Sequence, residues 1–240
     1  MPGHPPATPR PLRIALVAGE ASGDLLGAAL VHELKQRFPD AEFAGVGGPQ
    51  LRAAGLQAWH DCSELAVMGL AEVLRHLPRL LRLRRGLRQR LLAWRPDVFI
   101  GVDAPDFNLG LEARLKAAGV KTIHFVCPSI WAWRGERVVK LKAAADHVLC
   151  LFPFEPELLR AHGVAATFVG HPLADTIPLE VPRAQSRQAL GMAEGTPLVA
   201  VLPGSRGGEI RFIAPAFLQA VALMARQRPD VRFVLPVVPG

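Results

Sequence analysis

The chain has 240 residues, half of them hydrophobic, and carries a formal net charge of +7. This composition excludes a disordered or fibrous protein, and the length suits one large or two small domains. The three cysteines, Cys62, Cys127 and Cys150, lack metal-ligand spacing and predict free thiols in a reducing compartment.

Residues 1–11 are rich in proline and predict a flexible lead. They lack the apolar segment of a signal peptide. No apolar run in the sequence reaches the roughly 20 residues of a membrane span. We therefore expect a cytoplasmic protein.

The segment Leu12–Ala18 predicts a strand, and the loop Gly19–Asp24 leads from it into a helix. A strand, a glycine-bearing turn and a helix open a nucleotide-binding βαβ unit. The loop is not GxGxxG, and its two carboxylates oppose a bare pyrophosphate at the helix start. Hydroxyl groups suit them better, which predicts a sugar at Glu20, Ser22 and Asp24. The alternative is a tight turn in which Ser22 is the helix N-cap.

The positive charge is concentrated in one stretch after a second predicted strand, Glu42–Val46. Eight arginines lie between residues 75 and 95, and no acidic residue lies between Glu72 and Asp97. Without those eight arginines the net charge falls by eight, from +7 to −1. The excess is therefore a single patch.

Leucines and valines recur at helical spacing in this basic stretch, and arginines fill the other positions. Pro78 either starts a second helix or kinks the first. The composition is typical of an amphipathic element on an anionic membrane surface. The alternative is an ordinary amphipathic helix that packs on the sheet and has a solvated basic face. Nucleic acid is a less favoured partner, because the patch lacks aromatic residues on which bases could stack. The predicted membrane patch comprises Val67, Met68, Leu70, Val73, Leu74, Arg75, Leu77, Arg79 and Arg82.

Val98–Val102 is an apolar run without polar alternation, the pattern of a strand buried on both faces of a parallel sheet. Asp103 follows it directly, and Asp106 or Asn108 is placed to cap a helix that begins near Leu109. Functional groups of open α/β sheets collect at the carboxyl ends of the strands. Asp103 is therefore a candidate catalytic residue; the alternative is that it only caps a turn.

The rest of the sequence continues the alternation of strands and helices. The predicted strands are 120–126, 147–151, 167–170, 198–202 and 231–237, and the predicted helices are 109–118, 155–161 and 210–226. The loop Pro128–Arg134 contains two tryptophans that either line a pocket or anchor the loop. Ile177–Gln185, with two prolines, predicts a linker. We predict an α/β fold: a Rossmann-like, parallel-sheet domain over 12–176, then the linker and an incomplete second Rossmann-like domain over 177–240.

Six short segments carry a family signature. They are VAGEASGD at 17–24, GVGGPQL at 45–51, GVDAPDFN at 101–108, PSIWAWR at 128–134, VGHPLAD at 169–175 and LPGSRGGEI at 202–210. Each is weak alone, but in this order and spacing they are specific. With them the chain resembles the lipid-A-disaccharide synthases, which are bacterial inverting glycosyltransferases of GT-B architecture.

The resemblance implies transfer of a diacylglucosamine from UDP-2,3-diacylglucosamine to 2,3-diacylglucosamine 1-phosphate, without metal or cofactor. It implies an acceptor site in the first domain and a UDP site in the second, on a protein peripherally bound to the inner face of the cytoplasmic membrane. Asp103 matches the family's catalytic carboxylate and Arg206 its phosphate-site arginine. We expect Ser205 and Glu209 beside Arg206, and acceptor contacts from Glu20, Ser22, Asp24 and Asn108.

Members of this family normally continue well beyond the length of this chain. We therefore expect a fragment or an aberrant product that binds UDP weakly and does not turn over. Two alternative hypotheses remain: a GT-B UDP-sugar epimerase, which the basic leucine-rich patch disfavours, and a non-catalytic peripheral membrane module. A dinucleotide-dependent oxidoreductase is disfavoured because the first loop lacks GxGxxG.

Overall fold

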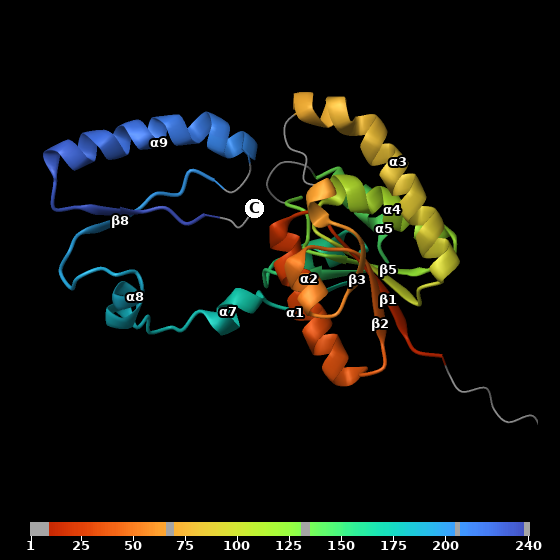
Figure 1. Cartoon of the computed structure of the whole chain (residues 1–240). Helices are drawn as coiled ribbons and strands as arrows, with labels where there is room; N and C mark the ends of the chain where they lie inside the picture. Colours follow the sequence, from red (N-terminus) through yellow and green to blue (C-terminus); the bar gives the residue numbers. More distant parts are fainter. Residues whose placement is uncertain (1–9, 66–69, 131–134, 205–206, 238–240) are drawn as a thin grey trace, which may run out of the picture. The chain divides into compact units, whose positions relative to one another are not determined.

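The computed structural model describes residues 10–65, 70–130, 135–204 and 207–237, with the side chains of 70–77 excepted (Figure 1). The chain divides into two compact units. The first comprises residues 1–67 and 75–176, and the second comprises 68–74 and 177–240. Each unit is described by itself.

A seven-stranded parallel sheet forms the centre of the first unit, in the order β3-β2-β1-β4-β5-β6-β7. Strands β1 to β6 thus follow the order 3-2-1-4-5-6 of a Rossmann-like sheet. This arrangement confirms the predicted α/β fold. The strands are β1 (Arg13–Ala18), β2 (Glu42–Val46), β3 (Gln57–His60), β4 (Val98–Val102), β5 (Lys121–Phe125), β6 (His147–Cys150) and β7 (Ala166–Phe168).

Helices connect these strands and cover both faces of the sheet (Figure 1). They are α1 (Ala21–Arg37), α2 (Pro49–Ala53), the 3-10 turn η1 (Cys62–Glu64), α3 (Leu70–Trp94), α4 (Pro105–Ala117), α5 (Arg137–Ala144) and α6 (Glu155–Ala161). A short helix, α7 (Pro172–Thr176), follows the last strand of this sheet and has no buried residue. Pro78 lies inside α3, which is assigned as one helix, so the predicted second helix start is wrong.

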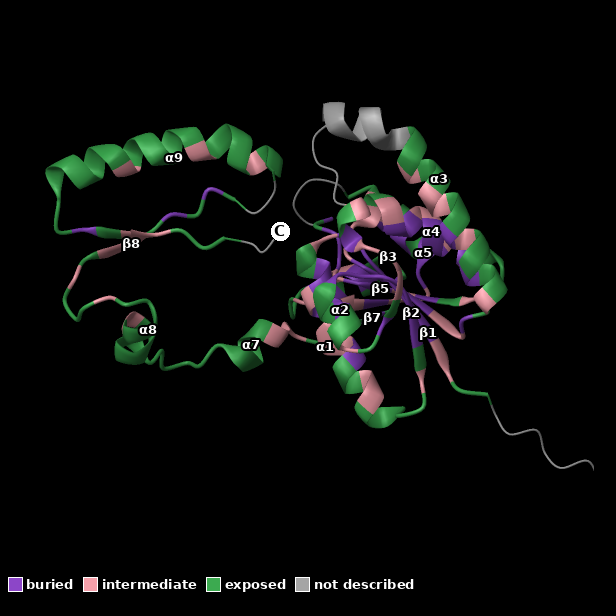
Figure 2. Ribbon diagram, viewed as in Figure 1, coloured by how far each residue is buried: buried purple, intermediate pink, exposed green. Residues whose placement is uncertain are grey.

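The apolar core lies on both sides of the sheet because successive residues of a strand point to opposite faces. Val17 of β1 belongs to a cluster with Leu87 of α3 and Leu111 of α4. Leu16, the preceding residue, belongs to a cluster with Leu26 of α1. Figure 2 shows the strands buried and the outer helix surfaces exposed.

The second unit contains a two-stranded parallel sheet of β8 (Leu198–Ala200) and β9 (Arg232–Val234), joined by α9 (Gly207–Gln227). A further helix, α8 (Arg183–Ala189), begins within the segment predicted as a linker, Ile177–Gln185, and extends beyond it. No residue of α9 is buried, and Phe212 is 81% exposed. By length and composition alone α9 is apolar enough to cross a membrane, with a mean hydropathy of 1.3, although charged residues interrupt its apolar sequence.

Candidate functional site

The connections of the sheet diverge at its two central strands, β1 and β4. From β1 the chain runs outward to β2 and β3, and from β4 it runs outward to β5, β6 and β7, while β1 and β4 pair with each other. Such a switch point leaves an opening at the carboxyl ends of the two central strands. Gly19 follows β1 and Asp103 follows β4, so both lie at this opening.

The loops after β1 and β4 approach each other closely. A Cβ atom on Gly19 would lie 2.7 Å from the Cβ atom of Ala104, a distance that real side chains do not reach. Glycine is therefore needed at this position to bring the two loops together. The close approach brings the backbone segments that carry Glu20 and Asp103 together at this opening, which we call the crevice.

Asp103 has an unusual backbone. It and Ala104 both have positive φ angles, +51° and +43°, a region that few non-glycine residues occupy. The Asp103 amide donates to the carbonyl of Phe125 over 2.8 Å, so strand β5 helps to hold the turn. A strained backbone at a strand end is typical of functional sites.

Asn108 forms hydrogen bonds with the ends of both central strands, β1 and β4. It is fully buried, and its side-chain amide donates to the carbonyls of Val17 at 3.1 Å and Asp103 at 2.9 Å. This placement corrects one prediction, since Asn108 lies inside α4 and does not cap it. The helix begins earlier than expected, at Pro105, because proline suits a first helical position.

The polar residues of the first loop separate into two groups. Asp24 is 2% exposed, and its carboxylate accepts hydrogen bonds from the backbone amides of Gly48, Gln50 and Leu51 at 2.7–3.1 Å. It caps α2, which corrects the prediction that it contacts the acceptor. Ser22 is exposed inside α1, whose N-cap is Glu20, so the alternative of a Ser22 N-cap is also wrong.

A cavity of about 250 Å³ lies beside Asp103. Its lining is Asp103, Pro105, Val126, Cys127, Pro128, Ser129 and Arg137. A hydrogen bond to Cys150, together with burial, raises the pKa of the Cys127 thiol and keeps it neutral. Asp103 and Arg137 are therefore the charged groups that this cavity offers. Trp131, Trp133 and Arg134 of the adjoining loop lie outside the described residues.

The sequence did not indicate Arg137, which the fold brings to the cavity. Its side chain is 16% exposed and pairs with Asp106 of α4, where Nη2 lies 2.9 Å from Oδ1 and 3.0 Å from Oδ2. The pair joins residues 31 positions apart. Nothing in the local sequence distinguishes Arg137 from the chain's other arginines, so sequence reasoning had no signal for it.

The predicted phosphate loop of the second unit is described only at its edges. Ser205 and Arg206 lie outside the described residues. Glu209 lies in the first turn of α9, with its side chain against Gly204. Helix α9 begins at Gly207, three residues earlier than predicted. Arg206 therefore directly precedes the first residue of α9 in the sequence.

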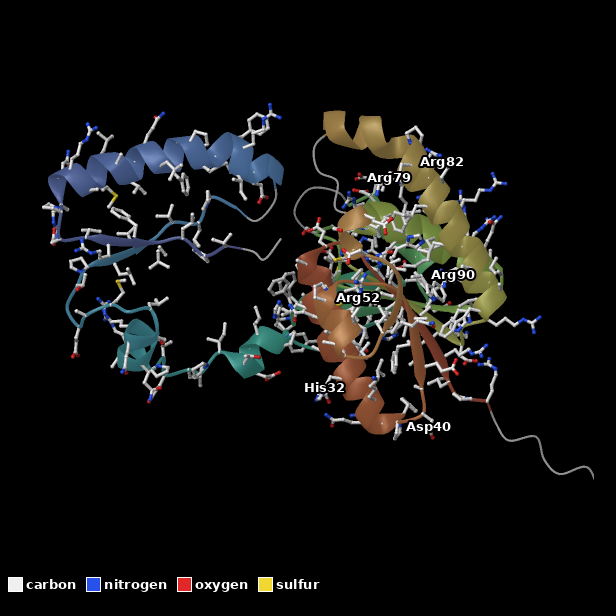
Figure 3. All side chains as sticks on the ribbon, in the orientation of Figure 1. His32, Asp40, Arg52, Arg79, Arg82 and Arg90 are labelled. Carbon is white, nitrogen blue, oxygen red and sulfur yellow. The ribbon has the colours of Figure 1, made fainter. Side chains whose placement is uncertain are left out.

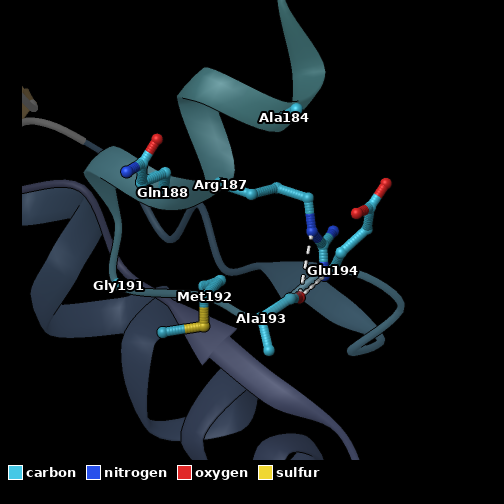
Figure 4. Close-up of a pocket in the computed structure, with 7 residues that line it drawn as sticks. All are labelled: Ala184, Arg187, Gln188, Gly191, Met192, Ala193 and Glu194. Carbon is cyan, nitrogen blue, oxygen red and sulfur yellow. Dashed lines mark hydrogen bonds between the residues drawn. The ribbon is translucent and has the colours of Figure 1, made fainter.

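A second hollow, of about 450 Å³, lies beside α8 (Figure 4). Arg187 is its one cation, and its guanidinium donates to the carbonyls of Ala193 and Thr196. Figure 4 shows this side chain turned toward the chain segment that follows α8. The arginine therefore stabilises the local turn, and the hollow offers no arrangement of reactive groups.

The described arginines of α3 differ in exposure: Arg79, Arg82, Arg85 and Arg90 are exposed, whereas Arg84 and Arg88 are half-buried. Figure 3 labels Arg79, Arg82 and Arg90 of this helix; Arg79 is 57% exposed, whereas the Arg90 guanidinium lies over the Trp59 ring, 4.5 Å from its centroid. Leu87 and Leu91 of the same helix are buried against the sheet. Of the predicted membrane patch, Val67 and Met68 lie outside the described residues, and nothing is described of the side chains of Leu70, Val73, Leu74, Arg75 and Leu77.

Among the residues that the structure describes, no group of three or more His, Cys, Asp or Glu side chains is arranged to hold a metal ion. The chemistry available at the crevice is that of a carboxylate, a guanidinium and hydroxyl groups. Groups of these kinds can hold a polar ligand, and the carboxylate can accept a proton from it.

The sheet order and the crevice define the first unit as a Rossmann-like domain, and the chain shares its overall fold with GT-B enzymes. A UDP-GlcNAc 2-epimerase from Neisseria meningitidis, solved with UDP-GlcNAc, covers 95% of this chain with a TM-score of 0.62 and 13% identity; the match spans 66% of that structure. The kitacinnamycin glycotransferase covers 95% of this chain and 66% of its own, with a TM-score of 0.58 and 21% identity. At these identities the likeness concerns the fold alone.

The family follows from sequence. The model of the family "Lipid-A-disaccharide synthetase" matches residues 14–240, and the chain belongs to this family. It is 56% identical to the lipid-A-disaccharide synthase of Xanthomonas euvesicatoria over 98% of its length, and 57% identical to that of Burkholderia thailandensis over 95%. It spans 54% and 59% of those two relatives, which is little more than half of each.

Proposed function

We propose that the chain carries the acceptor-binding domain, and the beginning of the donor-binding domain, of an inverting glycosyltransferase of lipid A biosynthesis. The reaction transfers diacylglucosamine from UDP-2,3-diacylglucosamine to 2,3-diacylglucosamine 1-phosphate, and yields lipid A disaccharide 1-phosphate and UDP. Membership of the family supports the overall activity.

The position of Asp103 is the observation that carries the proposal. Asp103 follows the carboxyl end of β4 and lines a cavity between the loops after β4 and β5, beside the switch point of the sheet. An inverting transfer needs one base to take the proton of the attacking hydroxyl while the nucleotide leaves from the opposite face. Asp103 is the proposed base, and Glu20 and Ser22 of the neighbouring loop are the proposed contacts for acceptor hydroxyls.

The donor contacts are proposed in the second unit. Arg206 directly precedes α9 in the sequence, with Ser205 and Glu209 on either side of it. Backbone amides at a helix N-terminus attract phosphate, and a guanidinium stabilises the charge that develops on departing UDP. Arg206 is therefore the proposed phosphate contact.

The proposed substrates carry acyl chains, so the enzyme must meet them at a membrane. The exposed arginines of α3 suit an anionic leaflet, where each cation near the surface contributes about 1 kcal/mol. We place the protein in the cytoplasm, peripherally bound to the inner face of the cytoplasmic membrane.

The test uses a chimera in which this chain continues into the remaining part of the Xanthomonas euvesicatoria relative. Incubated with UDP-2,3-diacylglucosamine and the lipid acceptor, it should release UDP and form the disaccharide phosphate. Product formation must depend on the acceptor. UDP-sugar isomerisation without acceptor would instead favour an epimerase, and the absence of both products would refute an enzymatic role.

A further inference from the structure

Arg137 is a cation in the same cavity as the proposed base. It is the first residue of α5, its side chain is 16% exposed, and it lines the cavity together with Asp103 and the exposed Ser129. A charge that is largely withdrawn from water interacts more strongly with an opposite charge than one at the surface does. This cation can therefore select an anionic ligand in the cavity.

The present partner of Arg137 is weakly held. Within the described residues the guanidinium donates only to Asp106, and only through Nη2. Asp106 is 86% exposed, so water screens its side of the ion pair. It can leave the arginine and recover its hydration at little cost.

A phosphate monoester is a stronger partner for such an arginine. It carries up to two negative charges, and its oxygens match the planar fork of the guanidinium in a two-point contact. Asp106 offers one charge and contacts only one of the guanidinium nitrogens. Phosphate should therefore displace Asp106 rather than bind beside it.

We propose that Arg137 anchors a phosphate-monoester subsite in the Asp103 cavity, and that Asp106 competes for it when no ligand is bound. The inference deepens the proposed function and rests on it for the identity of the ligand, the 1-phosphate of the sugar acceptor. On a pyranose ring, C1 and C5, the carbon that carries C6, both flank the ring oxygen. A base and a cation in one cavity can therefore contact the attacking C6 hydroxyl and the C1 phosphate of the same sugar.

The size of the cavity fits a sugar phosphate head. At about 250 Å³ it is smaller than the roughly 300–1,000 Å³ of pockets that enclose drug-sized ligands. It holds the head group, and the acyl chains stay outside. Arg137 would thus determine specificity for a phosphorylated acceptor, without taking part in the proton transfer.

Binding to the 240-residue chain tests the subsite directly. Calorimetric titration with glucosamine 1-phosphate should show binding, whereas glucosamine should bind more weakly. Arg137→Gln should lower the affinity for glucosamine 1-phosphate about 10- to 100-fold, the loss expected for a charge-assisted hydrogen-bonded contact. Arg137→Lys, which keeps the charge but loses the fork, should give an intermediate affinity. Arg37→Gln removes an exposed arginine of α1 and should change nothing.

The Asp106→Asn variant separates competition from direct contact, and it leaves Arg137 intact. Affinity for glucosamine 1-phosphate should rise because the competing carboxylate is gone. A fall in affinity would mean that Asp106 itself holds the ligand, and would overturn the proposal. An unchanged affinity in Arg137→Gln, or no binding by the unsubstituted chain at millimolar ligand, would overturn it as well.

In the chimera, Arg137→Gln should raise the KM for the lipid acceptor and leave the KM for the UDP donor unchanged. An active enzyme with an unaltered acceptor KM would refute the subsite while the proposed function stands. A chimera that transfers nothing would refute the proposed function, whereas Arg137-dependent binding of glucosamine 1-phosphate would still support the subsite.

Discussion

The side-chain amide of Asn108 donates to the main-chain carbonyl of Asp103 over 2.9 Å. The same amide donates to Val17 at the end of β1, so one buried side chain joins both walls of the crevice. The φ angle of Asp103 lies in the left-handed region, where the turn needs such support. Asn108 is therefore a positioning residue for the proposed base.

Asn108→Ala should lower the free energy of unfolding of the first unit by about 1–3 kcal/mol, since it leaves buried carbonyls without a donor. All four tryptophans precede residue 177, so tryptophan fluorescence during urea unfolding reports this unit. Ser22→Ala, at an exposed position, is the control and should shift the midpoint little. Equal midpoints for the two variants would contradict the role of Asn108.

Asp103→Asn in the chimera should lower turnover by about 100- to 10,000-fold, the usual loss when a general base is removed. Its tryptophan fluorescence and urea midpoint should stay near those of the unsubstituted chain. Asp40→Asn is the matched control. Asp40 is exposed and precedes β2, so it lies at the amino ends of the parallel strands, whereas the crevice lies at their carboxyl ends. Near-normal turnover in Asp103→Asn would rule out the assignment.

Replacing Arg82 and Arg85 of α3 by serine should weaken binding to vesicles that contain anionic lipid. Each arginine contributes about 1 kcal/mol near such a surface, and added salt screens the attraction. The control removes two exposed cations elsewhere, through Arg37→Ser and Lys140→Ser. Vesicle sedimentation at two salt concentrations measures the effect. Equal losses in both variants would show that α3 is not a specific docking surface.

The acid sensitivity of the first unit should depend on Asp97. The backbone amide of Arg13 and the Arg10 guanidinium hold the pKa of this carboxyl below its ordinary value. A lowered pKa adds stability that is fully present above the unfolded value of about 3.9 and is lost as pH falls through the folded pKa. The difference in urea midpoint between the unsubstituted chain and Asp97→Asn should therefore shrink below about pH 4. A difference that stays constant with pH would contradict this linkage.

The 240-residue chain should bind UDP weakly or not at all by calorimetric titration. The second unit, as described, has a two-stranded sheet and a helix without buried residues, and two strands alone are marginally stable. Such a unit positions phosphate contacts poorly. Tight binding that disappears in Arg206→Ala would show that this unit is sufficient for UDP.

The sequence predicted the central strands well and the marginal elements poorly. The limits of β2 and β4 match the predicted ones, since both are apolar runs bounded by polar or proline-containing segments. Strand β3 escaped prediction because it is a four-residue strand at the sheet edge with only intermediate burial. Helix α8 escaped because Pro182 indicated a linker, although proline also suits a helix start.

The location of Asp103 followed from strand order, but the contacts around it did not. Asp24 accepts its hydrogen bonds from residues 24–27 positions later, and a local pattern carries no sign of such partners. The same holds for Arg137 and Asp106. Sequence reasoning identified the carboxylate, while the distinction between ligand-facing and structural residues depended on tertiary contacts.

The pairing of β1 with β4 also shapes how the crevice forms. The hydrogen bond between Arg13 and Asp97 spans 84 residues, and that between Asn108 and Val17 spans 91. Closing loops of this length costs conformational entropy before any contact compensates for it, and such non-local pairings slow folding. We expect the β1–β2–β3 segment and the β4–β5–β6 segment to gain structure before they dock. The approach of the loops after β1 and β4 would then be completed only at that docking step, whereas the residues that line the Asp103 cavity all belong to the second segment.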